Sequence, residues 1–132
     1  MRERQVILSW ALSASREIVI VSPFVTNKRV IQTLQYFNNI VNKQVEITVV
    51  TRPSQDFKDK RKAVLEQIFD MLKNMGITVI LRSNIHQKFA IIDQKIVWYG
   101  SINLLSFGSA EESIMRLVGN NIAYELMKNI KI

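Results

Sequence analysis

The sequence contains no cysteine and only one histidine, His86. The absence of cysteine excludes disulfide bridges, zinc sites built on thiolates and a cysteine nucleophile. It is also typical of a reducing compartment, so we expect a cytoplasmic protein. A single histidine excludes a histidine-rich metal site within one copy of the chain.

Glycine and proline are scarce, with four and two residues, so the sequence shows no flexible linker that would divide it. Its 132 residues predict a single domain, residues 1–132, with one hydrophobic core. No run approaches the about 20 apolar residues that a membrane span requires. A basic start followed by a short apolar stretch imitates a secretory signal, but the apolar side chains share one helical face and favour an amphipathic helix. These side chains are Val6, Ile7, Trp10, Ala11 and Ala14.

Acidic residues are outnumbered: 11 Asp and Glu stand against 18 Lys and Arg, a formal net charge of +7. An excess of this size favours polyanionic partners, nucleic acid first and anionic lipid second, and we expect no membrane partner. Five cations cluster around a loop in the middle of the chain: Arg52, Lys58, Lys60, Arg61 and Lys62. The cluster is either a solvated helix face or, if it borders the active site, a track for a phosphate backbone.

Hydrophobic periodicity predicts strands alternating with helices, followed by a hairpin and a final helix. The expected strands span residues 17–21, 45–50, 77–81, 89–92, 95–99 and 113–118. The expected helices span residues 26–41, 56–75 and the end of the chain from 120. The helix over 56–75 is expected to end at Gly76 and to bury Phe57, Val64, Leu65, Ile68, Leu72 and Met75. The fold class is α/β, a mixed and largely parallel sheet between helix layers, with a tight turn at Asp93–Gln94.

The single histidine begins the most specific pattern in the chain, H-x-K-x4-D-x6-G-S-x-N. The pattern comprises His86, Lys88, Asp93, Gly100, Ser101 and Asn103. Composition alone would supply the five later residues at these offsets less than about once in a million cases. On a strand, His86 and Lys88 would share a face, and the returning strand of the hairpin would bring Ser101 and Asn103 beside them. A nucleophile, a cation and an amide at one point suit attack on a phosphate diester.

This pattern resembles the signature of the phospholipase D superfamily, and the resemblance extends from the strand ending Ser22-Pro23-Phe24 to the last helix. It implies that His86 attacks phosphorus to form a phosphohistidine, while a second histidine protonates the leaving oxygen and water then releases the product. Lys88 and Asn103 would hold the phosphoryl oxygens, and neither a metal ion nor another cofactor would be required.

The remaining motif residues have supporting roles in this interpretation. Ser101 would assist Lys88 and Asn103 at the phosphoryl oxygens, and Gly100 would either border the phosphate or simply permit a tight backbone. Asp93 would act structurally and electrostatically rather than directly in the chemistry. The family often has a carboxylate after the asparagine that orients the histidine. Here we prefer Glu112, although the loop length leaves Glu111 open.

The superfamily site normally uses two such motifs, whereas this chain holds one histidine. Either two copies meet across a two-fold axis, each contributing His86, or the site is incomplete. Small one-motif nucleases of the superfamily adopt the first solution, and a symmetric dimer is the commonest oligomer. We therefore expect a homodimer with one composite active site.

The sequence around the motif, residues 96–106 and 111–116, is similar to phospholipase D-like modules attached to bacterial helicases. This similarity implies one domain of a longer helicase-type protein, whose ATPase motor would lie outside the given sequence. Three functions stay open: a nuclease on DNA or RNA, a catalytically weak nucleic-acid-binding module of a helicase, and a lipid phosphodiesterase. Most aromatic side chains have core spacing, so the sequence indicates no particular stacking site for unpaired bases.

Overall fold

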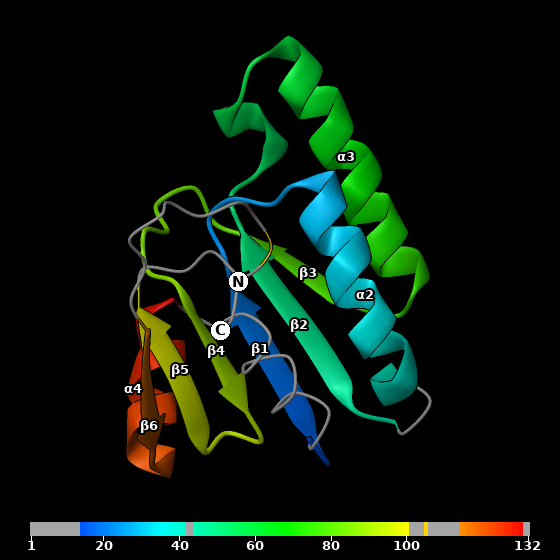
Figure 1. The fold of residues 1–132 in the computed structure, drawn as a ribbon. Coiled ribbons are helices and arrows are strands. Elements are labelled where there is room, and N and C mark those ends of the chain that lie inside the picture. The colour runs from blue at the N-terminus through cyan, green and yellow to red at the C-terminus, as the bar shows by residue number, and fades with distance from the viewer. Residues whose placement is uncertain (1–13, 42–43, 101–104, 106–113, 131–132) are drawn as a thin grey trace.

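The computed structural model describes residues 14–41, 44–100, 105 and 114–130 (Figure 1). The strands are β1 (Glu17–Val21), β2 (Glu46–Thr51), β3 (Thr78–Leu81), β4 (Phe89–Ile92), β5 (Ile96–Gly100) and β6 (Ile114–Val118). The helices are α2 (Asn27–Val41), α3 (Asp59–Asn74) and α4 (Asn120–Asn129), with a 3₁₀ turn, η1 (Ser54–Asp56), before α3. The helix expected near the N-terminus lies outside the described residues except for Ala14, which is buried.

The six strands form one sheet in the order β3-β2-β1-β4-β5-β6. β1 pairs with β2, and β2 with β3, in parallel, whereas β4, β5 and β6 join by antiparallel pairing. β5 therefore runs in the direction of β1, β2 and β3, so four of the six strands share one direction. The expected mixed, largely parallel sheet is confirmed.

Helices cover both faces of the sheet: α2 and α3 lie on one face and α4 lies on the other (Figure 1). Successive residues of a strand point to opposite faces, so β1 contributes to two separate hydrophobic clusters. Ile18 and Ile20 pack in the cluster under α3, which includes Leu65 and Leu72. Val19 and Val21 pack in the cluster that contains Ala123 and Ile130 at α4. A strand buried on both faces explains the continuous run of β-branched residues.

The start of α3 and part of its buried stripe differ from the sequence prediction. The helix begins at Asp59 rather than at residue 56, because Pro53 leads into the 3₁₀ turn, closed by a hydrogen bond from Phe57 N–H to Ser54 O of 3.1 Å. Val64 is 38% exposed, and Phe69 is buried in its place. The buried residues Leu65, Ile68, Phe69 and Leu72 follow the i, i+3, i+4, i+7 spacing of one face, which leaves Val64 on the flank.

Two chain reversals follow the sequence prediction. Gly76 lies immediately beyond α3 with φ +84°, the left-handed conformation expected of a glycine that ends a helix. The β4–β5 hairpin turns at Asp93 and Gln94, whose φ values are 54° and 57°, and Lys95 N–H donates to Ile92 O at 3.1 Å. Positive φ at both central residues characterises a type I′ turn, which matches the twist of the paired strands.

The direction of the strands defines the two ends of the sheet. We call the end at which β1, β2 and β3 finish, at Val21, Thr51 and Leu81, the carboxyl edge. Phe89, the first residue of the antiparallel β4, pairs with Val21 and therefore lies at this edge too. The hairpin turn at Asp93–Gln94 lies at the opposite edge.

Candidate active site

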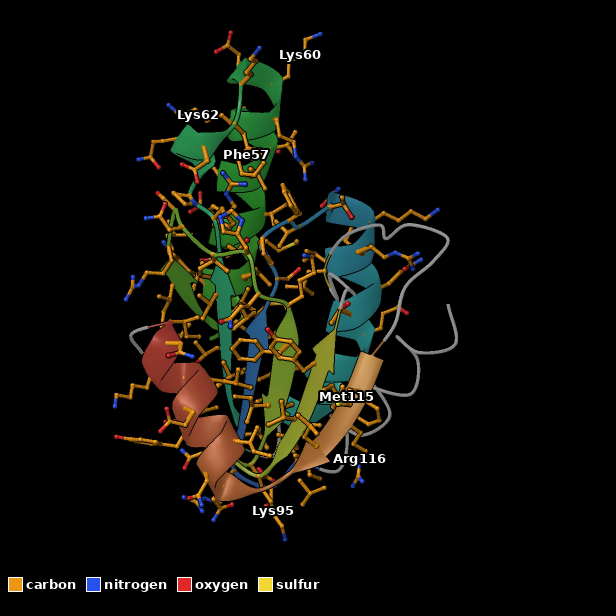
Figure 2. All side chains as sticks on the ribbon, turned by 90° about the vertical axis from the view of Figure 1, so that its left-hand side faces the viewer. Phe57, Lys60, Lys62, Lys95, Met115 and Arg116 are labelled. Carbon is orange, nitrogen blue, oxygen red and sulfur yellow. The ribbon has the colours of Figure 1, made fainter. Side chains whose placement is uncertain are left out.

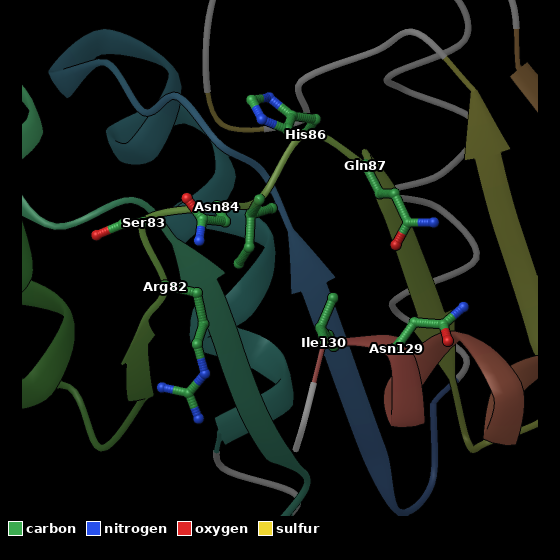
Figure 3. A pocket seen from close by; sticks show the side chains of 8 residues that line it. Arg82, Ser83, Asn84, His86, Gln87, Asn129 and Ile130 are labelled. Atoms are coloured by element: carbon green, nitrogen blue, oxygen red, sulfur yellow. The ribbon is translucent and has the colours of Figure 1, made fainter.

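His86 lies in the loop from β3 to β4, at the carboxyl edge (Figure 3). The loop leaves β3 with Arg82 N–H donating to Thr51 O at 2.9 Å. Ile85 is buried in the cluster that packs against α4, whereas His86 is exposed. A buried isoleucine therefore anchors the loop and leaves the adjacent imidazole accessible from outside. His86 and Lys88 both lie before β4, which begins at Phe89. The prediction that a shared strand face brings these two residues together is therefore wrong.

Lys88 is held by the hairpin and approaches His86 through its side chain. Gly100 N–H donates to Lys88 O at 3.3 Å, which continues the β4–β5 ladder beyond the Phe89–Tyr99 pair. The ammonium group, Lys88 Nζ, donates to the backbone oxygen of His86 at 3.3 Å. The lysine charge is thus held at the backbone of the histidine residue.

The other motif residues at this edge, Ser101 and Asn103, lie outside the described residues, as do Glu111 and Glu112. The residues that flank Ser101 and Asn103 are described. Gly100 is half-buried, and its N–H is used in the bond to Lys88. On the other side, Leu105 is buried, its N–H donates to Ser22 Oγ at 3.4 Å, and its oxygen accepts a bond from Thr26 N–H at 2.7 Å. Both flanking residues are therefore tied to the carboxyl edge.

Asp93 lies at the opposite edge of the sheet from His86, where it joins the hairpin turn to the start of β1. Its carboxylate accepts hydrogen bonds from the N–H groups of Ser15, Arg16 and Glu17, the shortest being 2.8 Å from Arg16. Partial burial acts to raise the pKa of Asp93, but the backbone bonds from Glu17, Arg16 and Ser15 and the Ser15 hydroxyl outweigh it and hold the pKa below its ordinary value. Asp93 is therefore bound to the backbone ahead of β1, away from the carboxyl edge, and its structural role stays a prediction.

Asp93→Asn is expected to destabilise the fold by about 1–3 kcal/mol, because it removes the charge from several hydrogen bonds at once. Asparagine tolerates the left-handed conformation at this position, so the change does not disturb the turn itself. Since the folded pKa is depressed, the carboxylate stabilises the wild type above its unfolded pKa of about 3.8 and ceases to do so as pH falls through the folded value. Urea unfolding at pH 7 and pH 3 measures both effects. A wild-type advantage that is equal at the two pH values would contradict this account.

A pocket of about 330 Å³ opens beside His86, between the β3–β4 loop and the end of α4 (Figure 3). It is lined by Arg82, Ser83, Asn84, Ile85, His86, Gln87, Asn129 and Ile130. Its lining combines the side chains of Asn84, Gln87 and Asn129 with those of Ile85 and Ile130. Sequence reasoning missed this pocket, because Asn129 and Ile130 are more than 40 residues from His86 and only the packing of α4 brings them to the loop. A second pocket, of about 840 Å³, lies at the opposite edge beside Asp93.

The basic cluster also lies beyond the carboxyl edge, at the start of α3, where Figure 2 shows Lys60 and Lys62 together with Phe57. Lys58, Lys60 and Lys62 are exposed. Arg52 forms an ion pair with Asp56, with Nε to Oδ2 at 3.1 Å. Arg61 is half-buried and donates from Nη2 to the backbone oxygen of Val25. The three lysines are thus the exposed members of the cluster after β2, whereas Arg61 joins α3 to the loop after β1.

Within 14–41, 44–100, 105 and 114–130, no group of three or more His, Cys, Asp or Glu side chains could hold a metal ion. No helix in this part of the chain is both long enough and apolar enough to cross a membrane.

Solved structures with the same fold include three distant relatives. NucT from Helicobacter pylori has a TM-score of 0.71 at 17% identity, over 98% of this chain and 86% of NucT. A polyphosphate kinase from Porphyromonas gingivalis has a TM-score of 0.68 at 12% identity, over 94% of this chain but 23% of the kinase. TrmBL2, an archaeal chromatin protein whose structure shows a novel mode of DNA binding, has a TM-score of 0.61 at 13% identity, over 96% of this chain and 45% of TrmBL2.

Sequence comparison gives a family but no individual relative. No curated protein matches the chain. The family model described as "Cardiolipin synthase, PLD-like domain" matches residues 7–131, which is almost the whole sequence. The motif around His86, the mixed sheet and this match agree, and the chain belongs to the phospholipase D-like family.

Proposed function

We propose that the protein is a metal-independent phosphodiesterase that cleaves DNA or RNA through a phosphohistidine on His86. The observation that carries the proposal is the accessible imidazole of His86 at the carboxyl edge, with the Lys88 ammonium group bonded to the backbone oxygen of the same residue. Lys88 Nζ lies 3.3 Å from His86 O, and a pocket opens next to the histidine. An exposed nucleophile, a fixed cation and space for a substrate are the elements that attack on a phosphodiester needs.

The reaction has two displacements at phosphorus. In the first, an imidazole nitrogen of His86 forms a bond to phosphorus, the bond from phosphorus to the leaving oxygen breaks, and a second, protonated imidazole gives that oxygen its proton. In the second, water attacks phosphorus, loses a proton to the second imidazole, and the phosphorus–nitrogen bond breaks. Lys88, Ser101 and Asn103 hold the non-bridging oxygens during both steps.

The second imidazole comes from His86 of a second copy, because each chain has one histidine. We propose a homodimer in which the two carboxyl edges face each other across the axis. One imidazole must then be neutral to attack phosphorus while the other is protonated to serve as the acid, so we expect the rate to have a bell-shaped dependence on pH. Glu112 is the proposed orienting carboxylate.

Nucleic acid is the favoured substrate class because of charge. The net charge of +7 and the exposed lysines 58, 60 and 62 suit a phosphate backbone. The fold shared with a DNA-binding chromatin protein supports the same choice. The name of the matching family model, which refers to a cardiolipin synthase, favours a lipid phosphodiester as the second candidate. A nucleic-acid-binding module attached to a helicase is the non-enzymatic alternative.

Cleavage of labelled single-stranded and double-stranded DNA and RNA in excess EDTA tests the proposal directly. We expect products to accumulate in EDTA, and a short-lived adduct that is stable in alkali but not in acid, as a phosphorus–nitrogen bond requires. Vesicles that contain phosphatidylglycerol form the second arm of the assay. Cleavage that appears only after Mg²⁺ or Mn²⁺ is added would contradict the metal-independent mechanism. Lipid turnover without nucleic-acid cleavage would favour the lipid enzyme, and binding without turnover would favour the helicase module.

A further inference from the structure

Two phenylalanines from different loops meet at the carboxyl edge. Phe24 follows β1, and Phe57 lies between η1 and α3. Their rings are in edge-to-face contact, with centroids 6.0 Å apart and planes inclined at 76°. The guanidinium carbon of Arg52 lies 5.6 Å from the centroid of each ring, so one cation contacts both. Phe24 is 38% exposed and Phe57 is half-buried, so the group is open to solvent on one side.

Buried polar groups hold Phe24 in place. Ser22 is fully buried, and its hydroxyl donates to Phe24 O at 2.7 Å. Thr51, which is also buried, directs its hydroxyl to Pro23 O at 3.4 Å. Arg61 donates to Val25 O and so ties the start of α3 to the same loop. An exposed aromatic ring on a loop fixed at three successive residues is preorganised for contact with a ligand.

The charges around the rings favour a polyanion. The ion pair with Asp56 fixes Arg52 near the two rings and offsets part of its charge. Immediately after Phe57 the chain carries exposed Lys58, Lys60 and Lys62, with Asp59 as the one acidic residue among them. Aromatic rings next to a row of cations are the combination that binds single strands, in which the bases stack on the rings and the phosphates meet the cations.

We propose that Phe24 and Phe57, with Arg52 between them, form a stacking platform for unpaired bases of single-stranded DNA or RNA. The proposal rests on the proposed function for its substrate class and adds a preference for single strands over duplexes. In a duplex the base faces are already stacked within the helix, so the rings have no free base to accept. The platform lies at the same edge of the sheet as His86, so a single-stranded nucleic acid bound on it can extend toward the histidine.

The test measures binding rather than cleavage, so its result does not depend on whether the protein is a nuclease. The probe is a single-stranded oligothymidylate with one 2-aminopurine, whose fluorescence is quenched by stacking, and a duplex of the same length is the comparison. All proteins carry His86→Ala, which prevents cleavage. Phe24→Ala is expected to weaken single-strand binding about tenfold and to relieve part of the quenching, with duplex binding unchanged. Phe24→Trp is expected to retain binding.

The salt dependence separates stacking from charge. Loss of a stacked base should leave the slope of log affinity against log salt unchanged, because no phosphate contact is removed. Val64→Ala is the matched control, since Val64 is an apolar side chain that is also 38% exposed and has no aromatic ring to stack on a base. Three results for Phe24→Ala would overturn the platform: an equal loss of affinity for single strands and duplexes, an unchanged affinity, or a changed oligomeric state in place of weaker binding. The last result would assign Phe24 to a protein interface. If the platform binds single strands but the wild-type protein does not cleave nucleic acid, only the proposed function is overturned.

Discussion

His86→Ala is expected to lower the rate of phosphodiester cleavage by about 10⁴-fold to 10⁶-fold, which is the effect of removing a nucleophile. No other imidazole in the sequence can replace it, because His86 is the single histidine. The side chain is exposed, so the change in unfolding free energy should stay within about 0.5 kcal/mol. Single-turnover rates in EDTA, together with thermal unfolding of both proteins, measure the two quantities. A variant that folds normally and retains a tenth of the activity would exclude His86 as the nucleophile.

The composite site also predicts how much activity a mixture of wild-type and His86→Ala chains retains. Wild-type and His86→Ala chains mixed in equal amounts and allowed to exchange should form about one quarter wild-type dimers. If cleavage needs both histidines, the mixture retains about one quarter of the wild-type activity at the same total concentration. If each chain works alone, the mixture retains about one half. Sedimentation of the two proteins and of the mixture verifies that all three are dimers, and a monomeric wild type would remove the basis of the composite site.

The order of strands and helices could be predicted from the sequence because most elements are amphipathic or buried on both faces. The β-branched run at Glu17–Val21 became a central strand, and Gly76 ended α3 in the conformation that glycine favours. The start of α3 was harder to place. Phe57 is apolar and has helical spacing from Arg61 and Val64, but Pro53 and the 3₁₀ turn fix the chain in a different geometry. The spacing of hydrophobic residues along the sequence does not indicate a 3₁₀ turn of this kind.

Site residues could be predicted from the sequence where they belong to one local motif. They could not be predicted where the fold brings together residues that are distant in the sequence. His86 and Lys88 lie two positions apart, so a local pattern identifies the pair. Phe24, Arg52 and Phe57 come from the ends of two strands and from the turn before α3, and they meet only because β1 and β2 pair in parallel and finish at the same edge. Nothing in the spacing of these three residues predicts a contact, and aromatic residues with ordinary core spacing gave no signal of exposure.

Lys88→Ala is expected to lower the cleavage rate by about 10²-fold to 10³-fold, which corresponds to about 2.7–4 kcal/mol of transition-state stabilisation. In the free protein, Lys88 Nζ lies 3.3 Å from the backbone oxygen of His86, so the charge is already held at the residue that the proposal makes the nucleophile. Lys88→Arg keeps the charge but changes its reach, and we expect it to recover only part of the rate. Lys95→Ala is the matched control, because it removes the same charge at the opposite end of the molecule (Figure 2).

Whether the substitution changes kcat or KM distinguishes a lysine that takes part in catalysis from one that only attracts the substrate. Removal of a charge that only attracts nucleic acid raises KM and leaves kcat unchanged, and this effect disappears in high salt. Lys88 and Lys95 would then behave alike. Removal of a charge that stabilises the developing phosphoryl oxygens lowers kcat, and the loss persists at high salt because the contact is short and shielded by the bound substrate. We expect the second result for Lys88 and the first for Lys95, so equal behaviour of the two variants would remove Lys88 from the chemistry and leave it as part of the general positive field.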